Sequence, residues 1–182
     1  MKLNKKQFYK LSVRPTVVIS TISQNGIPNA APFSFNSPVG IDPPRFCFAC
    51  NPKHDTWRNI RENSEFVVNY VGEEFGPLMH ILERDYPYGV NEIKEAVLTE
   101  VKAELVKPPR IKEAYAWLEC RMAMNYDVGD HILIIGDVLK VEVKDEFMKN
   151  DILNVEKAKP LNHIFGEYFV CRMKVDKFKR EQ

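Results

Sequence analysis

The longest stretch of the sequence without a charged side chain covers residues 15–41, and it limits the possible folds more than any other feature. It is long enough to cross a bilayer as a helix. However, it contains Pro15, Pro28, Pro32 and Pro38, two glycines and many polar side chains. Proline lacks the backbone donor that a helix interior requires, and a membrane span is predominantly apolar. We therefore expect this stretch to form strands and turns.

The first part of this stretch has the composition of a β-hairpin. Residues 16–23 read Thr-Val-Val-Ile-Ser-Thr-Ile-Ser, and β-branched side chains of this kind favour strands. Asn25-Gly26 follows, a pair that favours a tight type I′ turn because both positions accept positive φ. The returning strand from Ile27 is interrupted by prolines that cannot donate to a ladder, so we expect an edge or bulged strand.

The clearest of the later strands covers residues 131–144, where apolar and polar positions alternate with a period of two. The other predicted strands are residues 45–50 (after a loop that ends at residues 42–44), 64–71, 114–124 and 168–175, the last closing the sheet. A helix is predicted from an N-cap at Asp55 or Thr56 to about residue 63. Shorter helices are expected at residues 77–84 and 91–96, and residues 145–160 could be helical or looped. This pattern predicts a mainly β fold, a small antiparallel barrel with a few short helices, as a single domain over residues 1–182.

Charge and cysteine content exclude several classes of function. The chain has 26 basic and 25 acidic residues, whereas nucleic-acid binding requires a basic surface. Residues 1–6 lack the apolar core of a signal peptide. The four cysteines are too few and too scattered for a disulfide framework. These features predict a cytoplasmic protein that binds neither nucleic acid nor a membrane.

Common catalytic motifs are missing from the sequence. It has no glycine-rich dinucleotide fingerprint, no Walker loop and no Gly-x-Ser-x-Gly elbow, and its four histidines lack zinc-protease spacing. Cys47 and Cys50 form a Cys-x-x-Cys pair, but on a predicted strand side chains three apart point to opposite faces. We interpret both as small buried hydrophobic residues and predict no metal site.

Two segments together predict a binding site. Residues 31–37 (Ala-Pro-Phe-Ser-Phe-Asn-Ser) combine flat aromatic rings, small polar side chains and backbone N–H groups left free by the prolines. These groups suit a heteroaromatic ring that carries carbonyl and imine acceptors. Residues 52–56 place Lys53 and Thr56 at the start of a helix, which suits a phosphate. Either segment alone is typical of a bulged hairpin or an ordinary helix start, but together they indicate a flat, phosphorylated cofactor.

A series of short motifs covers nearly the whole chain: Arg14-Pro15, residues 29–36 (NAAPFSFN), 42–44 (DPP), 53–62 (KHDTWRNIRE), 65–69 (EFVVN), 86–90, 107–111, 118–121 (LECR), 129–138 and 160–168. In this order the motifs resemble the flavin reductase and flavoredoxin family. The resemblance implies a Greek-key-like, antiparallel split β-barrel that binds FMN. It also implies a homodimer with flavin sites at or near the subunit interface.

The resemblance also implies roles for individual residues. Those that would line the isoalloxazine are Pro32, Phe33, Ser34, Phe35 and Asn36. Those that would hold the ribityl phosphate end are Lys53, Asp55 and Thr56. His131 follows Gly129-Asp130 near the open flavin face and would be the catalytic residue that meets the nicotinamide of NAD(P)H. A structural role for His131 at the start of a strand is an equally good interpretation.

Two segments depart from the family pattern. His54 stands between Lys53 and Asp55, where the flavoredoxin branch has Lys-Asp-Thr directly, so the register of the phosphate site is open by one residue. Residues 162–165 (Asn-His-Ile-Phe) are bulkier than the glycine-rich segment of the family, which would alter substrate access.

Three functions remain open from the sequence. In the first, NAD(P)H reduces bound FMN, which passes electrons to an acceptor; the isoalloxazine supplies the chemistry and the protein supplies binding and orientation. In the second, the protein is a flavoredoxin-type carrier that another protein reduces. In the third, it is a split-barrel ligand-binding module without redox turnover.

Overall fold

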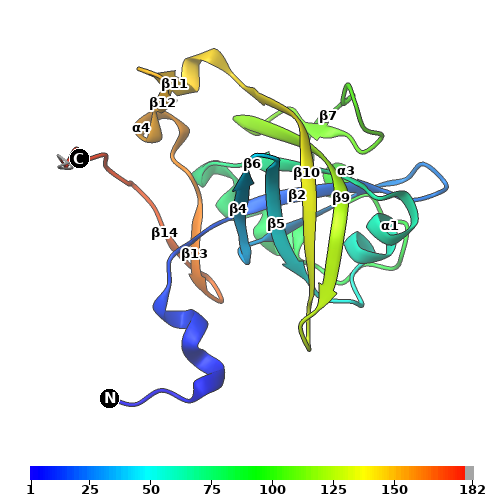
Figure 1. The fold of residues 1–182 in the computed structure, drawn as a ribbon, viewed down its shortest axis with the longest axis horizontal. Coiled ribbons are helices and arrows are strands. Elements are labelled where there is room, and N and C mark those ends of the chain that lie inside the picture. Colours follow the sequence, from blue (N-terminus) through cyan, green and yellow to red (C-terminus); the bar gives the residue numbers. More distant parts are fainter. Residues whose placement is uncertain (179–182) are drawn as a thin grey trace.

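The computed structural model describes residues 1–178, and its central element is a seven-stranded antiparallel sheet with the order β3-β2-β6-β9-β10-β5-β4 (Figure 1). Its strands are β2 (Val17–Ile22), β3 (Pro28–Phe33), β4 (Asn36–Ile41), β5 (Pro44–Cys50), β6 (Glu65–Tyr70), β9 (Ala116–Asp127) and β10 (Ile132–Val143). The two edge strands, β3 and β4, follow each other in the chain, so Ser34 and Phe35 cross the opening of a split barrel. The predicted mainly β, antiparallel architecture is confirmed.

Shorter elements surround this sheet. The helical ones are η1 (Lys5–Leu11), α1 (Asp55–Asn63), η2 (Glu73–Leu78), α2 (Met79–Leu82), α3 (Glu92–Glu95), η3 (Asp145–Phe147) and α4 (Val155–Ala158). A second sheet has the order β1-β13-β14 and consists of β1 (Arg14–Pro15), β13 (Asn162–Phe165) and β14 (Tyr168–Val170). Two further ladders join β7 (Glu100–Val101) to β8 (Arg110–Ile111) and β11 (Met148–Lys149) to β12 (Ile152–Leu153).

The β2–β3 hairpin forms as predicted, but its turn is of a different type. β3 pairs only with β2 and is an edge strand, as expected from its prolines. Of the turn residues only Gly26 has positive φ (77°), and its N–H donates to the Ser23 carbonyl at 3.0 Å. The connection is therefore a longer loop that ends in a left-handed glycine, and the predicted two-residue type I′ turn is wrong.

β2 (Val-Val-Ile-Ser-Thr-Ile) is buried on both faces of the strand. Val17 and Ile19 pack in one core cluster, with Phe46 and Phe66 among its members. Val18, which points the other way, packs in a second cluster that also contains Phe75 and Leu82. Because both faces of β2 are covered, its sequence shows no alternation of apolar and polar residues.

Two expectations about strands need correction. Residues 36–41 form β4 rather than a loop, although Pro38 and Gly40 lie within it. An edge strand tolerates this because β4 pairs with β5 alone, with a register shift between Pro38 and Gly40. The predicted closing strand at residues 168–175 is shorter, Tyr168–Val170, and joins the second sheet. Gly166, with φ of 54°, turns the chain back along β13 and away from the main sheet.

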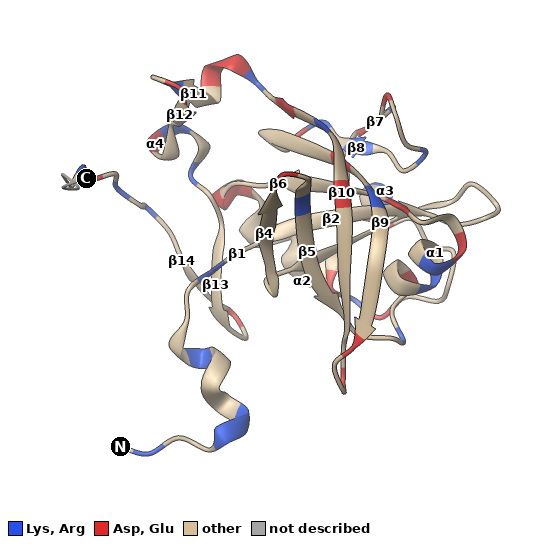
Figure 2. Cartoon of the chain, viewed as in Figure 1, with Lys and Arg blue, Asp and Glu red and all other residues tan. Residues whose placement is uncertain are grey.

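Charged residues of both signs are interspersed along the described chain (Figure 2). A helix that is long and apolar enough to cross a membrane does not occur within residues 1–178.

Candidate cofactor site

Two cavities lie side by side where β3, β5 and the start of α1 come together, and they share Asn51 and His54 in their walls. The smaller cavity, of about 220 Å³, is lined by Tyr9, Arg14, Pro32, Phe33, Ser34, Phe35, Ala49, Asn51, His54, His131 and His163. The larger, of about 350 Å³, is lined by Asn29, Asn51, Lys53, His54, Asp55, Thr56, Arg84, Asp85, Tyr86 and Glu92. The structure thus places the two segments singled out in the sequence in adjoining cavities.

The wall of the smaller cavity is formed by the crossing between β3 and β4. The backbone N–H of Ala49 donates to the Phe35 carbonyl at 2.8 Å and ties this crossing to β5. Asn36 lies outside the cavity lining; its side chain donates to the Pro15 and Phe33 carbonyls at 2.8 and 2.9 Å. Pro32, Phe33, Ser34 and Phe35 line the cavity as expected, whereas Asn36 holds the shape of the crossing.

His131 reaches the same cavity from the end of the β9–β10 connection, immediately before β10 begins at Ile132. Its ring lies 5.7 Å from the Phe35 ring, and its Nδ1 is 2.9 Å from the Asp130 carboxylate. The hydrogen bond to His131 lowers the pKa of Asp130. The loop before it is held by the Val128 N–H, which donates to the His131 carbonyl at 3.0 Å. The imidazole therefore forms part of the cavity wall, with one nitrogen oriented by Asp130.

The larger cavity opens at the N-terminus of α1. The N-cap is His54, without a side-chain cap hydrogen bond, so the predicted cap at Asp55 or Thr56 is wrong. The first N–H groups of a helix have no acceptor within it and carry partial positive charge. Lys53 lies exposed beside them, and Arg84 adds a second cation to the wall. These cations and free N–H groups are suited to bind an anion.

Three carboxylates share the wall of the larger cavity with these cations: Asp55, Asp85 and Glu92. Burial raises the pKa of Asp55, and Asp85 raises it further against the opposing effect of Arg58. Burial also raises the pKa of Glu92, whose carboxylate accepts from Asn29 Nδ2 at 2.9 Å and from the Ala30 N–H at 3.1 Å. Carboxylates accept from hydroxyl groups, so this part of the wall suits a polyol chain rather than a phosphate.

Thr56 is fully buried, and its hydroxyl is used inside the protein. It donates to the Asn29 carbonyl oxygen at 3.1 Å, which also accepts from the Thr21 hydroxyl at 3.0 Å. A threonine hydroxyl has one hydrogen to donate, and here an amide oxygen takes it. The contribution expected of Thr56 to a phosphate site is thus limited to its backbone N–H.

We therefore expect the isosteric substitution Thr56→Val to act on stability. Loss of one buried hydrogen bond lowers the free energy of unfolding by roughly 1 kcal/mol, which urea denaturation of the apoprotein would measure. The ratio of FMN to riboflavin affinity should stay at the parent value. A drop in that ratio with unchanged stability would show that the hydroxyl contacts the phosphate.

Several lining residues were not assigned a role from the sequence. Tyr9, Arg14 and His163 come from η1, β1 and β13, and the second sheet brings them to the crossing between β3 and β4. Arg14 and His163 lie in motifs that carried the family resemblance, and His163 also lies in the segment, residues 162–165, that departs from the family pattern. Asn51, Arg84, Asp85 and Glu92 carried no signal that separates them from ordinary loop and turn residues.

The Cys-x-x-Cys pair and three side chains of α1 that lie outside both cavities behave as ordinary structural residues. Cys50 is a buried core residue, and burial raises the pKa of its thiol to about 12, whereas Cys47 is half-buried. Trp57 packs against the core cluster that contains Cys50. Arg58 and Arg61 lie on the exposed face of α1. Within residues 1–178 no group of three or more His, Cys, Asp or Glu side chains could hold a metal ion.

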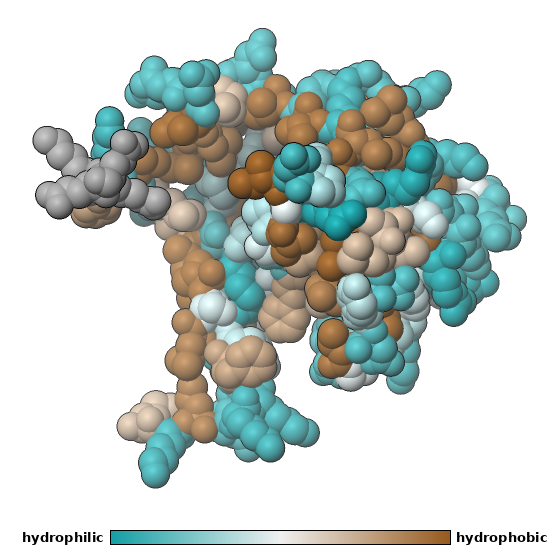
Figure 3. All heavy atoms as spheres, in the orientation of Figure 1, coloured by the Kyte–Doolittle hydropathy of each residue, from teal (hydrophilic) through white to brown (hydrophobic). Residues whose placement is uncertain are grey.

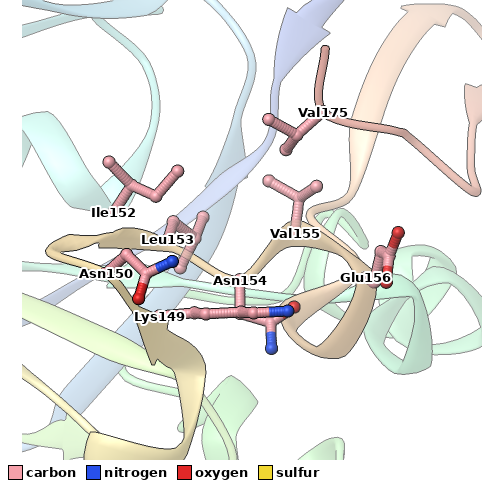
Figure 4. A pocket seen from close by; sticks show the side chains of 8 residues that line it. All are labelled: Lys149, Asn150, Ile152, Leu153, Asn154, Val155, Glu156 and Val175. Carbon is pink, nitrogen blue, oxygen red and sulfur yellow. The ribbon is translucent and has the colours of Figure 1, made fainter. Parts of the chain in front are cut away.

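A further cavity, of about 200 Å³, lies among β11, β12, α4 and the segment that contains Val175 (Figure 4). Its apolar side chains are Ile152, Leu153, Val155 and Val175. It shares no residue with the two adjoining cavities. We do not assign it to the candidate site.

The two adjoining cavities meet the requirements of a flavin nucleotide. The smaller one offers flat and aromatic walls, and the larger one offers carboxylates for hydroxyl groups and cations with a helix N-terminus for a phosphate. The residues that would hold the cofactor are thus Pro32, Phe33, Ser34 and Phe35 at the ring end and Lys53 with the start of α1 at the phosphate end.

Comparison with known proteins defines the class. The model of the flavin reductase like domain matches residues 9–171, and the chain belongs to this family. An uncharacterized protein of Aquifex aeolicus is 38% identical over 173 residues, which cover 89% of this chain and 88% of that protein. The family supports a flavin cofactor and an oxidoreductase role.

Solved structures support the same fold. Nitrilotriacetate monooxygenase component B from Bacillus cereus superposes with a TM-score of 0.89 at 25% identity, covering 97% of this chain and 95% of that one. Flavoredoxin of Desulfovibrio vulgaris (Miyazaki F) superposes with a TM-score of 0.87 at 16% identity, covering 98% and 97% of the two chains. The predicted split barrel is confirmed.

Proposed function

We propose that the protein binds FMN across the two adjoining cavities and that NAD(P)H reduces the bound flavin, which then passes electrons to an acceptor. The observation that carries this proposal is that the two cavities adjoin and share Asn51 and His54 in their walls. A cavity suited to a ring that adjoins a cavity suited to an anion matches a ligand in which a polyol links a ring to a phosphate. Neither end alone would distinguish FMN from a simpler ligand.

The protein residues bind and orient in this mechanism. Lys53, Arg84 and the first N–H groups of α1 would bind the phosphate, while Pro32 to Phe35 would line the ring end of the site. His131 would orient the nicotinamide carboxamide, with Asp130 fixing its ring. When bound, FMN supplies the hydride acceptor, because no side chain of the protein can take a hydride.

We expect the protein to purify yellow and to release intact FMN on denaturation. The test is chromatography of the released flavin, together with quenching of FMN fluorescence by the apoprotein. A colourless protein that also fails to quench added FMN would remove the basis of the proposal.

We also propose that two copies of the chain form a homodimer with the flavin sites near the interface. The η1 helix buries none of its residues, and Phe8 and Leu11 are 72% and 78% exposed. Apolar side chains follow this arm and the adjoining β13–β14 strands (Figure 3). Exposed apolar surface of this kind is typical of an interface between protein chains.

Light scattering at micromolar concentration should accordingly give about twice the 21.1 kDa chain mass. Replacement of Phe8 and Leu11 together by serine should shift the protein toward the monomer, because it removes apolar area from the proposed interface. A parent protein that is monomeric with a full complement of flavin would contradict a site near a subunit interface.

A further inference from the structure

A histidine from the second sheet is hydrogen-bonded to the ring end of the site. His163 lies on β13, and its Nδ1 is 3.2 Å from the hydroxyl of Ser34. Its other nitrogen, Nε2, is 2.9 Å from the Gly166 carbonyl. Ser34 and His163 both line the smaller cavity, and both also line a side pocket of about 70 Å³ behind it. The bond thus lies in the wall that the flavin ring would touch.

The Gly166 carbonyl decides the direction of the hydrogen bond to Ser34. A carbonyl oxygen only accepts, so Nε2 carries the hydrogen of the neutral imidazole. Nδ1 then has a lone pair and accepts from the Ser34 hydroxyl. With its single hydrogen turned toward His163, Ser34 presents only lone pairs to the cavity and acts as an acceptor toward a ligand.

Protonation of His163 reverses this arrangement. Both ring nitrogens of an imidazolium are donors, so Nδ1 donates to the Ser34 oxygen. The hydroxyl hydrogen is then free to turn into the cavity, and Ser34 becomes a donor toward a ligand. Histidine is the side chain that ordinarily changes charge between about pH 5 and pH 8.

Groups of both signs surround His163. Arg14 is its register partner on β1, and Phe169 of β14 lies 4.9 Å away, ring to ring. Glu83, at the end of α2, lines the side pocket; burial raises the pKa of Glu83, and the positive charge of His163 opposes that shift. The titratable and charged groups that face His163 or its strand are Tyr9, Lys10, Arg14, His54, Glu83 and His131.

We propose that His163 is a positioning residue that sets whether Ser34 offers a donor or an acceptor to the ring end of the site. The consequence for the cofactor rests on the proposed function. The oxidised isoalloxazine presents mainly carbonyl and imine acceptors, so it matches Ser34 as a donor. Affinity for oxidised flavin therefore rises when His163 is protonated.

The hydrogen bond itself can be tested on the apoprotein, without any flavin. Histidine ¹⁵N NMR above the titration range should show the hydrogen of His163 on Nε2 and Nδ1 as an acceptor. Ser34→Ala should move the Nδ1 resonance and the titration midpoint of His163. Ser37→Ala, a matched change at a serine that bonds to the Pro38 carbonyl, should move neither. A hydrogen on Nδ1 at high pH, or a His163 signal indifferent to Ser34→Ala, would overturn the inference.

The effect on the ligand is tested with riboflavin, because it has the same ring but no titrating phosphate. The parent protein and the control His80→Gln, at an exposed histidine outside both cavities, should bind riboflavin about three- to tenfold more tightly at pH 5 than at pH 8. In Ser34→Ala and His163→Phe, the affinity for riboflavin should no longer differ between pH 5 and pH 8. If Ser34→Ala still binds riboflavin more tightly at pH 5 than at pH 8, the proposed role of His163 is contradicted. Failure of riboflavin and FMN to bind at any pH would refute the proposed function, and the NMR experiment would still decide the inference.

Discussion

The substitution Lys53→Ala is expected to weaken FMN binding about ten- to a hundredfold and to leave riboflavin binding at the parent level. Lys53 lies exposed beside the uncapped start of α1, where a phosphate would meet its ammonium group. A charge-assisted hydrogen bond contributes roughly 1.5–3 kcal/mol, and each 1.4 kcal/mol is about a factor of ten in affinity. The measurement is a fluorescence-quenching titration of the apoprotein with each ligand.

Arg61→Ala is the matched control for Lys53→Ala, because it removes a cation from the exposed face of the same helix without touching the cavity. This variant should bind FMN like the parent. If Lys53→Ala also binds FMN like the parent, the phosphate is held elsewhere, and Arg84, the other cation in the cavity wall, becomes the residue to replace.

His131→Ala is expected to slow reduction of the bound flavin by NAD(P)H about 10- to 100-fold and to leave FMN affinity nearly unchanged. The imidazole lies in the wall of the smaller cavity, oriented by Asp130. One positioning contact with the nicotinamide, worth roughly 1.4–2.7 kcal/mol in the transition state, corresponds to this change in rate. Anaerobic stopped-flow absorbance would measure the rate.

Two controls separate this role of His131 from a structural one. Reduction by dithionite requires no nicotinamide position and should proceed at the parent rate in His131→Ala. His80→Ala, at an exposed histidine outside both cavities, should leave the NAD(P)H rate unchanged. Loss of FMN or of folded protein in His131→Ala would assign the residue to the structure of the barrel.

The sequence predicted the local elements well where one physical signal dominated. β2 was evident from its β-branched run, the edge position of β3 from its prolines, and α1 from helix-start signals near residue 55. β4 was missed because Pro38 and Gly40 are strand-breaking signals, and only its place at the sheet edge makes them tolerable. β14 pairs with β13 because the chain turns back at Gly166, which has positive φ. The sequence alone did not show to which sheet this turn would bring the strand.

The sequence predicted the parts of the site that are local motifs and missed those that long-range strand pairing brings to it. Pro32 to Phe35 and Lys53 to Thr56 are local motifs, and they form the two ends of the site. Tyr9, Arg14 and His163 reach it only because β1 pairs with β13, a contact between residues about 150 positions apart in the sequence. The use of the Thr56 hydroxyl inside the protein depends on Asn29, which the fold places against the start of α1. Pairings of this kind depend on topology rather than on local pattern.

Anaerobic titration of the FMN-loaded protein with NADH and with NADPH tests the proposed activity most directly. We predict that at least one of the two nicotinamides bleaches the visible absorbance of the bound flavin at one equivalent, and faster than it bleaches free FMN under the same conditions. If dithionite reduces the bound FMN but neither NADH nor NADPH does, the proposed reductase activity is contradicted. The protein would then be a carrier that another protein must reduce.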